Sequence, residues 1–149
     1  MKYPRYEYQT ENELHFFEFT SKGNKGNIRK IVQYTKIGDE NIYNLAFGDY
    51  DNKTKEINDK IVTNNGDGRK VLATVVSTLY AFTEKYPTKW VFATGSNSVR
   101  TRLYRMGITN NLTELKKDFY VYGILVDETF EEYLIDKNYI GFLVKRKNH

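Results

Sequence analysis

Residues 66–93 read GDGRKVLATVVSTLYAFTEKYPTKWVFA, and this stretch decides the fold class of the chain. Its apolar residues recur at spacings of three and four from Leu72 to Phe82, which is the pattern of one buried helix face, and the pattern ends at Tyr86-Pro87. Trp90–Ala93 then form a short, wholly apolar run, typical of a central strand buried on both faces. The sequence therefore predicts a βαβ unit in which Trp90–Ala93 lie parallel to the strand that precedes the helix.

The segment before this helix predicts antiparallel strands. Alternating or β-branched apolar residues occupy Leu14–Thr20, Ile28–Ile37, Ile42–Phe47 and Ile57–Thr63, and turn-forming Gly, Asn and Asp residues separate these runs. Gly38-Asp39 joins the second and third runs into a hairpin. The fourth run extends the hairpin into a meander that leads directly into the helix.

A second helix is predicted from Asn97 to about Met106. Ser96 is placed to cap its start, and Gly107 is placed to end it as a left-handed residue. Its predicted apolar side comprises Val99, Leu103 and Met106.

The remainder of the chain predicts a closing pair of strands. Residues 111–118 form a polar connector or short helix, residues 119–126 and 139–145 alternate as strands, and a Glu-rich turn or helical segment joins these strands. We therefore predict a single domain over residues 1–149 of the α+β class. Its sheet is mixed, largely antiparallel and twisted, with a central βαβ unit and two packed helices.

Composition excludes several kinds of site. The chain has 149 residues, no cysteine and 2 histidines, so disulfides, thiolate nucleophiles and Cys-ligated zinc are excluded, and we predict no metal site. No stretch approaches the roughly eighteen apolar residues of a membrane span, and no apolar run follows Met1-Lys2, so we expect a cytoplasmic protein that does not enter membranes. The net charge of +4 permits an anionic partner without requiring one.

The turn before the first helix is one candidate binding site. It places Gly66, Gly68, Arg69 and Lys70 where a strand gives way to a helix. Helix N-termini carry unpaired N–H groups and the positive end of the helix dipole, so this turn suits a phosphate or a carboxylate. The alternative is an ordinary Asn-Gly and Asp-Gly turn whose Asp67 caps the helix.

The turn before the second helix is the other candidate. Its candidate residues are Gly95, Ser96, Asn97, Arg102 and Arg105. The two arginines are neighbours on the helix, whereas Arg100 projects elsewhere. Two such turns at the ends of neighbouring parallel strands define a crevice, which is where open α/β sheets bind ligands. The alternative is a solvated helix face on which arginines pair with glutamates.

Histidine and tyrosine give weaker signals. His15 lies in an aromatic strand, so we interpret it as half-buried scaffold. Aromatic residues crowd two places, the N-terminus with Tyr3, Tyr6 and Tyr8 and a late strand with Phe119, Tyr120 and Tyr122. Exposed aromatic side chains with arginines nearby stack on bases or anchor a protein interface, and the alternative is that they are half-buried strand residues with hydroxyls in water.

Five stretches of the chain carry a first resemblance: IYNLAFGDYD, GDGRKVLATVVSTLYAFTEKYP, WVFATGS, RTRLYRMGI and YIGFLVKRK. Through them nearly the whole chain resembles an uncharacterised bacterial family, catalogued as a domain of unknown function. This resemblance implies no activity.

A second resemblance rests on the order of elements from Ile28 onward and on residues 97–108, NSVRTRLYRMGI. They resemble a GNAT-type acetyltransferase. In that superfamily a Gly-x-Gly turn before the long helix holds the cofactor pyrophosphate, and a later helix carries an Asn and a Leu-Tyr pair. The resemblance implies a GNAT-like fold and acetyl-CoA, or another phosphate-bearing ligand, as the cofactor.

The GNAT resemblance assigns roles to four residues. Gly66 and Gly68 match the two glycines, Asn97 matches the Asn, and Tyr104 matches the tyrosine that protonates the leaving thiolate. The chain departs from the pattern at Thr63, where the superfamily has Gln or Arg, and within the Gly-x-Gly turn, where an aspartate adds negative charge.

Three functions follow as hypotheses. The first is a non-catalytic ligand- or protein-binding module on a GNAT-like scaffold, with a protein partner or a homodimer. The second is an acyl-CoA-dependent N-acyltransferase with Tyr104 as the acid. The third is a nucleic-acid-directed component, such as the toxin of a toxin–antitoxin pair. This third function needs Arg100, Arg102, Arg105 and the basic C-terminal residues to form one positive surface.

Overall fold

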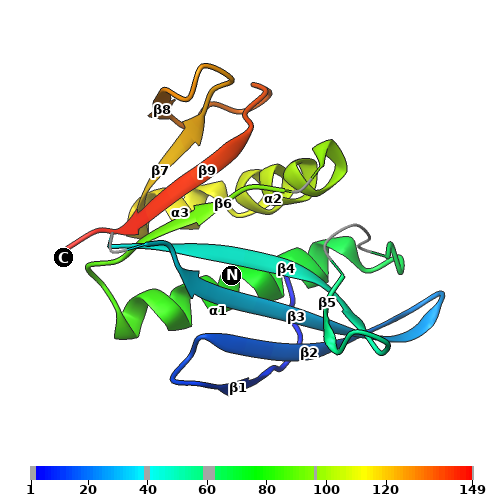
Figure 1. Ribbon diagram of the computed structural model, residues 1–149. Coiled ribbons are helices and arrows are strands. Elements are labelled where there is room, and N and C mark those ends of the chain that lie inside the picture. Colours follow the sequence, from blue (N-terminus) through cyan, green and yellow to red (C-terminus); the bar gives the residue numbers. More distant parts are fainter. Residues whose placement is uncertain (1–2, 39–40, 59–62, 96, 149) are drawn as a thin grey trace.

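The computed structural model describes residues 3–38, 41–58, 63–95 and 97–148. In these ranges nine strands form one sheet and three helices pack against it (Figure 1). The strands are β1 (Gln9–Glu11), β2 (Phe16–Gly23), β3 (Gly26–Lys36), β4 (Ile42–Asp51), β5 (Glu56–Ile57), β6 (Trp90–Ala93), β7 (Phe119–Ile124), β8 (Phe130–Glu132) and β9 (Gly141–Arg146). The helices are α1 (Gly68–Lys85), α2 (Ser98–Asn110) and α3 (Leu112–Asp118). The predicted α+β class is confirmed.

The strand order in the sheet is β1-β2-β3-β4-β6-β9-β7-β8, with β5 paired to β4 alone. β4 and β6 pair in parallel, and the other described pairs are antiparallel. α1 connects the two parallel strands, so the predicted central βαβ unit is present. The predicted hairpin is the β3–β4 pair, in which Val32 lies opposite Phe47.

One predicted pairing is wrong. The strand expected over residues 57–63 was to be the parallel neighbour of Trp90–Ala93, but that neighbour is β4. Ile57 lies in the two-residue β5, Thr63 lies in the loop before α1, and residues 59–62 lie outside the described ranges. β6 pairs with β4 at Ile42–Asn44, and β5 pairs with β4 at Tyr50–Asp51. The two strands therefore pair with opposite ends of β4.

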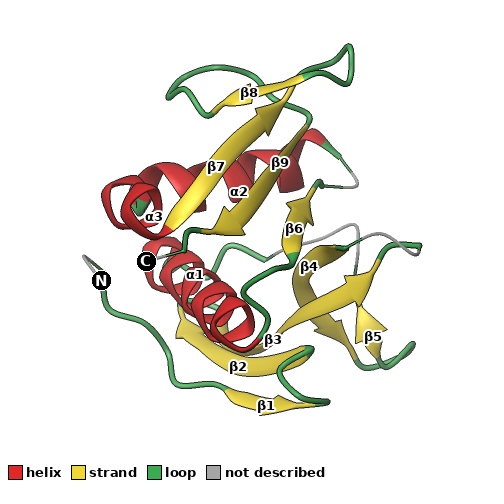
Figure 2. Cartoon of the chain, turned by 90° about the vertical axis from the view of Figure 1, so that its left-hand side faces the viewer, coloured by secondary structure: helices red, strands yellow, loops and turns green. Residues whose placement is uncertain are grey.

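One face of the sheet carries the core. Because side chains alternate along a strand, Phe17, Val32 and Phe47 line up across β2, β3 and β4 on the same side. Val91 continues this side in β6. α1 lies in the hollow of the twisted sheet on this face and buries its apolar stripe there (Figure 2). Each fully buried large apolar side chain contributes roughly 1.5–3 kcal/mol to folding.

The buried face of α2 differs from the predicted one. Val99 is 67% exposed and Met106 is 42% exposed, while Arg100, Tyr104 and Gly107 are buried. The buried residues also follow helical spacing, and hydrogen bonds to the sheet compensate the polar groups among them. Hydropathy alone therefore selected the wrong side of this helix.

Gly107 does not end α2 as predicted. The helix continues to Asn110 because Gly107 does not take the left-handed conformation. Gly107 faces α1, since a Cβ there would lie 3.5 Å from Leu72. The connector over residues 111–118 contains helix α3, one of its two predicted forms. The Glu-rich segment has turns on both sides of strand β8, so it takes the predicted turn form and not the predicted helical form. No helix among the described residues is long and apolar enough to cross a membrane.

Candidate functional site

The sequence predicted a crevice between the turns before α1 and α2, beside two neighbouring parallel strands. In the structure that parallel pair is β4 and β6, which separate beyond Asn44. The two strands pair over Ile42–Asn44 and Trp90–Phe92, after which β4 continues to Asp51 while β6 ends at Ala93 (Figure 1). Beyond Asn44 the backbone of β4 consequently no longer pairs with β6. A ligand that entered an open sheet at a parallel pair would use this edge.

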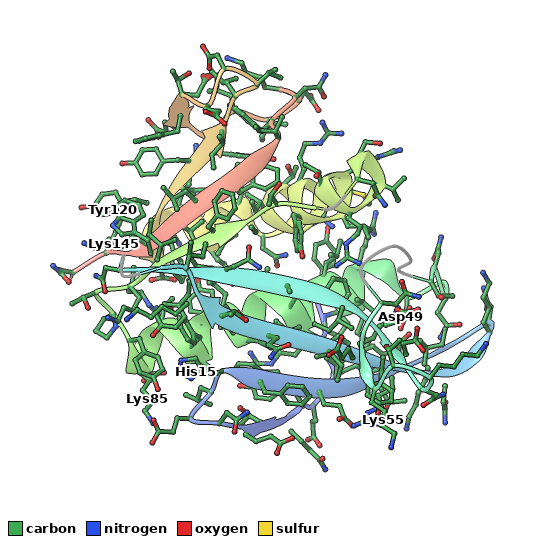
Figure 3. The ribbon with its side chains drawn as sticks, viewed as in Figure 1. His15, Asp49, Lys55, Lys85, Tyr120 and Lys145 are labelled. Atoms are coloured by element: carbon green, nitrogen blue, oxygen red, sulfur yellow. The ribbon has the colours of Figure 1, made fainter. Side chains whose placement is uncertain are left out.

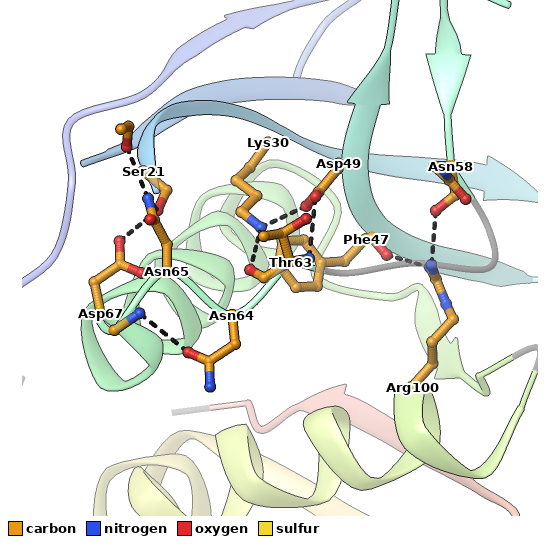
Figure 4. Close-up of polar contacts among 12 residues, drawn as sticks. Ser21, Lys30, Phe47, Asp49, Asn58, Thr63, Asn64, Asn65, Asp67 and Arg100 are labelled. Atoms are coloured by element: carbon orange, nitrogen blue, oxygen red, sulfur yellow. Dashed lines mark hydrogen bonds and ion pairs between the residues drawn. The ribbon is translucent and has the colours of Figure 1, made fainter. Parts of the chain in front are cut away.

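Two side chains of α2 occupy that edge. The backbone N–H of Phe47 donates to the Tyr104 hydroxyl at 3.1 Å. The Arg100 guanidinium donates to the Phe47 carbonyl oxygen (Figure 4). Arg100 also donates to the carbonyl oxygen of Asn58 at 2.9 Å. Both polar groups of Phe47 are thus paired with the buried face of α2, and a ligand here would have to displace Arg100 and Tyr104.

The rest of the β4 edge is paired with the chain that follows it. The backbone N–H of Asn58 donates to the carbonyl oxygen of Asp49 at 2.8 Å, and β5 pairs with Tyr50 and Asp51. Gly48 has no room for a side chain, since a Cβ there would lie 2.7 Å from Ile57. From Phe47 to Asp51 the edge is therefore closed by the protein itself.

Tyr104 lies in the core. Its side chain is 7% exposed, and burial raises the pKa of its phenol, an effect that the Arg100 charge partly offsets. The ring lines a small apolar cavity between α1, α2 and the sheet, together with Leu45 and Val91. The proposed role of Tyr104 as an acid stays a prediction, and the hydroxyl that would perform it is engaged with Phe47.

The turn before α1 is covered by the β2–β3 hairpin. Asn65 is 1% exposed, and its side-chain amide donates to the Ser21 hydroxyl at 3.1 Å and to the Gly26 carbonyl at 2.9 Å. Its Oδ1 accepts from the backbone N–H of Lys25 at 2.6 Å. Gly66 takes φ +81°, the left-handed value that a Gly tolerates without strain. The hairpin tip therefore lies where an anion over this turn would approach.

Asp67 places a carboxylate at the positive end of α1. Its Oδ2 accepts from the hydroxyls of Tyr6 and Ser21, each at 2.6 Å, and it makes no side-chain cap hydrogen bond. Asp67 occupies the N-cap position of α1, as the alternative interpretation predicted, but its side chain makes no capping hydrogen bond. A carboxylate here interacts favourably with the helix dipole and repels a second anion. Burial and the hydrogen bond to Asp67 raise the pKa of the Tyr6 phenol.

The cations of the first turn face the N-terminal segment. The Arg69 guanidinium lies 5.4 Å from the centre of the Tyr3 ring, and the Lys70 ammonium lies 4.2 Å from that of Tyr6. Gly68 faces open space, since a Cβ added to it would have no neighbouring atom within 4 Å. The structure thus brings the four predicted residues of this turn together without directing the two cations at a common point.

A buried ion pair that sequence reasoning missed fixes the start of this turn. Lys30 is 1% exposed. Its ammonium donates to the Asp49 carboxylate and to the Thr63 carbonyl oxygen, the latter at 3.1 Å (Figure 4). The second oxygen of Asp49 accepts from the backbone N–H of Thr63 at 3.0 Å. Lys30 lies on the inward side of β3 with Val32. The alternation of the strand could therefore have indicated this pair, because a charged residue in phase with core residues indicates a buried partner.

The turn before α2 opens onto a groove, which we call the α2 groove. It has a volume of about 700 Å³ and lies between the first half of α2 and the segment before β9. Its lining comprises Thr94, Gly95, Ser98, Val99, Thr101, Arg102, Arg105, Asn138, Tyr139 and Ile140. The sequence predicted Gly95, Arg102 and Arg105 in one site, and the structure brings these three together.

Hydrogen bonds hold the walls of the groove in place. The backbone N–H of Gly95 donates to the Thr101 hydroxyl at 3.2 Å, and Arg105 donates to the side-chain oxygen of Asn138 at 2.8 Å. Asn97 caps α2 by accepting from the backbone N–H of Arg100 at 3.0 Å. Ser96, the predicted cap and phosphate ligand, lies outside the described residues.

A family model matches residues 2–147 and is described as a family of unknown function, DUF6934. The chain belongs to this family. Neither the curated proteins nor the solved structures contain a match to the chain. The resemblance to a family of unknown function is therefore confirmed, and the site has to be interpreted from its own geometry.

His15, the remaining candidate for chemistry, is part of an aromatic cluster. The His15 ring packs against the rings of Tyr43, Phe82 and Tyr86, and its Nδ1 lies 2.8 Å from the Asn12 carbonyl oxygen. This is the half-buried scaffold role that the sequence predicted. Among the described residues no group of three or more His, Cys, Asp or Glu side chains is arranged to hold a metal ion.

Proposed function

We propose that this protein is a non-catalytic binding module on a GNAT-like scaffold. The observation that carries the proposal is the closed edge of β4, where Arg100 and Tyr104 hold both backbone groups of Phe47. The parallel β4–β6 pair joined through α1, in a sheet otherwise antiparallel in its described pairs, supports the scaffold. A module of this kind keeps the fold of an enzyme while its own side chains occupy the reaction centre.

Electrostatics at the first turn support the same proposal. An acyl-CoA would bring its pyrophosphate to the start of α1, where the Asp67 carboxylate already lies against the helix dipole. The hairpin residue Asn24 occupies the space beside Gly66, since a Cβ on Gly66 would lie 2.7 Å from its Nδ2. Cofactor binding would need both groups to move.

The α2 groove is the binding site that we assign to this module. Arg102 and Arg105 supply positive charge, Ser98 and Thr101 supply hydroxyls, and Ile140 is one of the apolar residues of its lining. Guanidinium groups bind carboxylates and phosphates in pairs of parallel hydrogen bonds. The groove thus suits a ligand that combines one anionic group with a small apolar part.

The nucleic-acid hypothesis based on three arginines has less support. It requires Arg100, Arg102 and Arg105 on one surface, but Arg100 is 5% exposed and donates to Phe47 and Asn58. The acyltransferase hypothesis requires an accessible Tyr104 and an open β4 edge. No specific observation favours the acyltransferase or a nucleic-acid site built on these three arginines.

A thermal-shift assay separates a module from an enzyme. Purified protein is heated with acetyl-CoA, with CoA, and with a panel of small carboxylates and phosphates, since a ligand of the folded state raises the melting temperature. We expect no rise with acetyl-CoA beyond that with CoA, and a rise with at least one anion that Arg102→Glu abolishes and Lys85→Glu leaves unchanged. Lys85 is the matched control because it is an exposed cation at the far end of α1.

Two other outcomes of the assay would contradict the proposal. A rise specific to acetyl-CoA that Gly66→Asp abolishes and Arg102→Glu leaves intact would contradict the module and return the first turn to the role of a cofactor loop. A melting temperature that no compound changes would remove the α2 groove from consideration as an anion site.

A further inference from the structure

The sheet has a second face, turned away from the helices, and its C-terminal half is rich in aromatic side chains. Strand alternation directs Trp90 of β6 and Tyr120 of β7 to this face, opposite to the core residues Val91 and Val121. Tyr120 and its β9 neighbour Lys145 lie beside each other in Figure 3. We call this surface the open aromatic face. Its members are Trp90, Phe92, Tyr120, Tyr122, Phe130, Glu132, Leu143 and Lys145.

The first row of the face alternates rings with a cation. Lys145 lies opposite Trp90 on one side and opposite Tyr120 on the other, in the central strand β9. Its ammonium lies 5.5 Å from the centre of the Trp90 ring, and the ammonium of Lys147 lies 5.4 Å from that of Tyr120. Neighbouring strands are about 4.8 Å apart, so the backbones that carry Trp90 and Tyr120 lie roughly 10 Å apart, with Lys145 on the strand between them.

The second row extends the aromatic surface to the edge of the sheet. The Tyr122 ring lies 6.0 Å from that of Trp90 and 5.7 Å from that of Phe130. Tyr120 is 49% exposed and Phe130 is 61% exposed. A groove of about 330 Å³ runs beside β7, and its lining includes Tyr120, Tyr122, Lys116 and Lys147. Exposed rings and lysines therefore share one continuous surface.

We propose that the open aromatic face binds single-stranded nucleic acid. Bases stack on the exposed ring of Tyr120 and on the half-buried rings of Trp90 and Tyr122, and the phosphates between them contact Lys145 and Lys147. Stacking needs flat rings that solvent reaches on one side, which an uncovered sheet face supplies. The charge of the chain, +4, has the sign that a polyanion requires.

The choice of cation distinguishes this partner from a protein. Protein interfaces are enriched in arginine and depleted in lysine, whereas a lysine ammonium is a common point charge for phosphate. The cations over the rings of Trp90 and Tyr120 are both lysines. Glu132 lies at the β8 end of the face, opposite Tyr122, so the positive charge is concentrated toward β9 and α3.

This surface is separate from the α2 groove. The open aromatic face and the lining of the groove have no residue in common, and α2 packs on the opposite side of the sheet. A substitution that abolishes binding at one of these two surfaces should therefore leave binding at the other unchanged.

Fluorescence anisotropy with a labelled oligouridylate of about ten nucleotides tests the proposal. We expect saturable binding that weakens as salt rises. Tyr120→Leu should weaken it roughly tenfold, while Tyr120→Phe, which keeps a flat ring, should retain it. Lys145→Gln should weaken binding and lower the slope of log Kd against log salt by about 0.7.

Lys85→Gln is the matched control. It removes the same charge from another cation that lies near a ring, that of Tyr86, at 5.8 Å. Equal weakening by Lys85→Gln and Lys145→Gln would overturn the proposal, because binding would then reflect net charge alone. Absence of binding at low salt would also overturn it. Sedimentation as a dimer that Tyr120→Leu dissociates would assign the face to a second copy of the chain. The melting temperature of each variant verifies that it is folded.

Discussion

The turn before α1 and the turn before α2 have similar residues and different surroundings. Both place small residues at a helix start with cations close behind. The first is covered by the hairpin tip, with Asn65 buried beneath it and a carboxylate at the helix end. The second opens onto the α2 groove, which Arg102 and Arg105 line. A local motif for anion binding therefore acquires its function only from what packs against it.

The largest expected effect concerns the ion pair that anchors the first turn. Lys30→Met removes the cation and leaves the Asp49 carboxylate buried beside Thr63, so we expect a loss of roughly 3–5 kcal/mol in the free energy of unfolding. Urea denaturation measures it. The exposed pair of Arg29 and Glu18 is the control, since Glu18→Gln should cost at most about 1 kcal/mol. Equal losses would show that the first turn is not anchored by this pair.

The next effect compares one asparagine from each turn. Asn65→Ala removes three hydrogen bonds between the first turn and the hairpin and should cost roughly 2–3 kcal/mol. Asn97→Ala removes one helix cap from the second turn and should cost about 1 kcal/mol. Both values come from denaturation of the purified variants. A larger loss for Asn97→Ala would reverse the order of rigidity that the comparison assigns to the two turns.

A smaller effect depends on pH and belongs to the first turn. The pKa of Tyr6 is raised in the folded protein, by burial first and then by the Asp67 carboxylate. Its contribution is therefore fully present below the unfolded pKa of about 10 and is lost as pH rises through the folded pKa. Tyr6→Phe should cost about 1 kcal/mol at neutral pH. The difference from the wild type should shrink above pH 10 in denaturation curves, and a constant difference would contradict the linkage.

The smallest effect separates the two glycines of the first turn. Gly68 has open space at the position of a Cβ and lies at the start of α1, so Gly68→Ala should stabilise the fold by roughly half a kcal/mol. Gly66→Ala should instead destabilise it, because Gly66 has φ +81° and faces Asn24. Melting temperatures of the two variants give the comparison. Stabilisation by both would show that the left-handed turn and its contact with the hairpin are not needed.

Much of the fold was predictable because its signals are local. The helix at residues 68–85, the buried strand Trp90–Ala93 and the β3–β4 hairpin all follow from periodicity and turn residues. The α2 groove was half predictable. Gly95, Arg102 and Arg105 are close in sequence, whereas Asn138 is supplied from 33 residues beyond Arg105.

The sequence by itself determined the class of the fold, the long helix and the strand after it, because the hydrophobic period of a segment depends on its own residues. The tertiary structure alone decided which side of α2 is buried, what covers the first turn and what closes the β4 edge. Arg100 is the clearest case. Its guanidinium is buried because the carbonyl oxygens of Phe47 and Asn58 compensate its lost hydration, and those partners are more than 40 residues away in the chain.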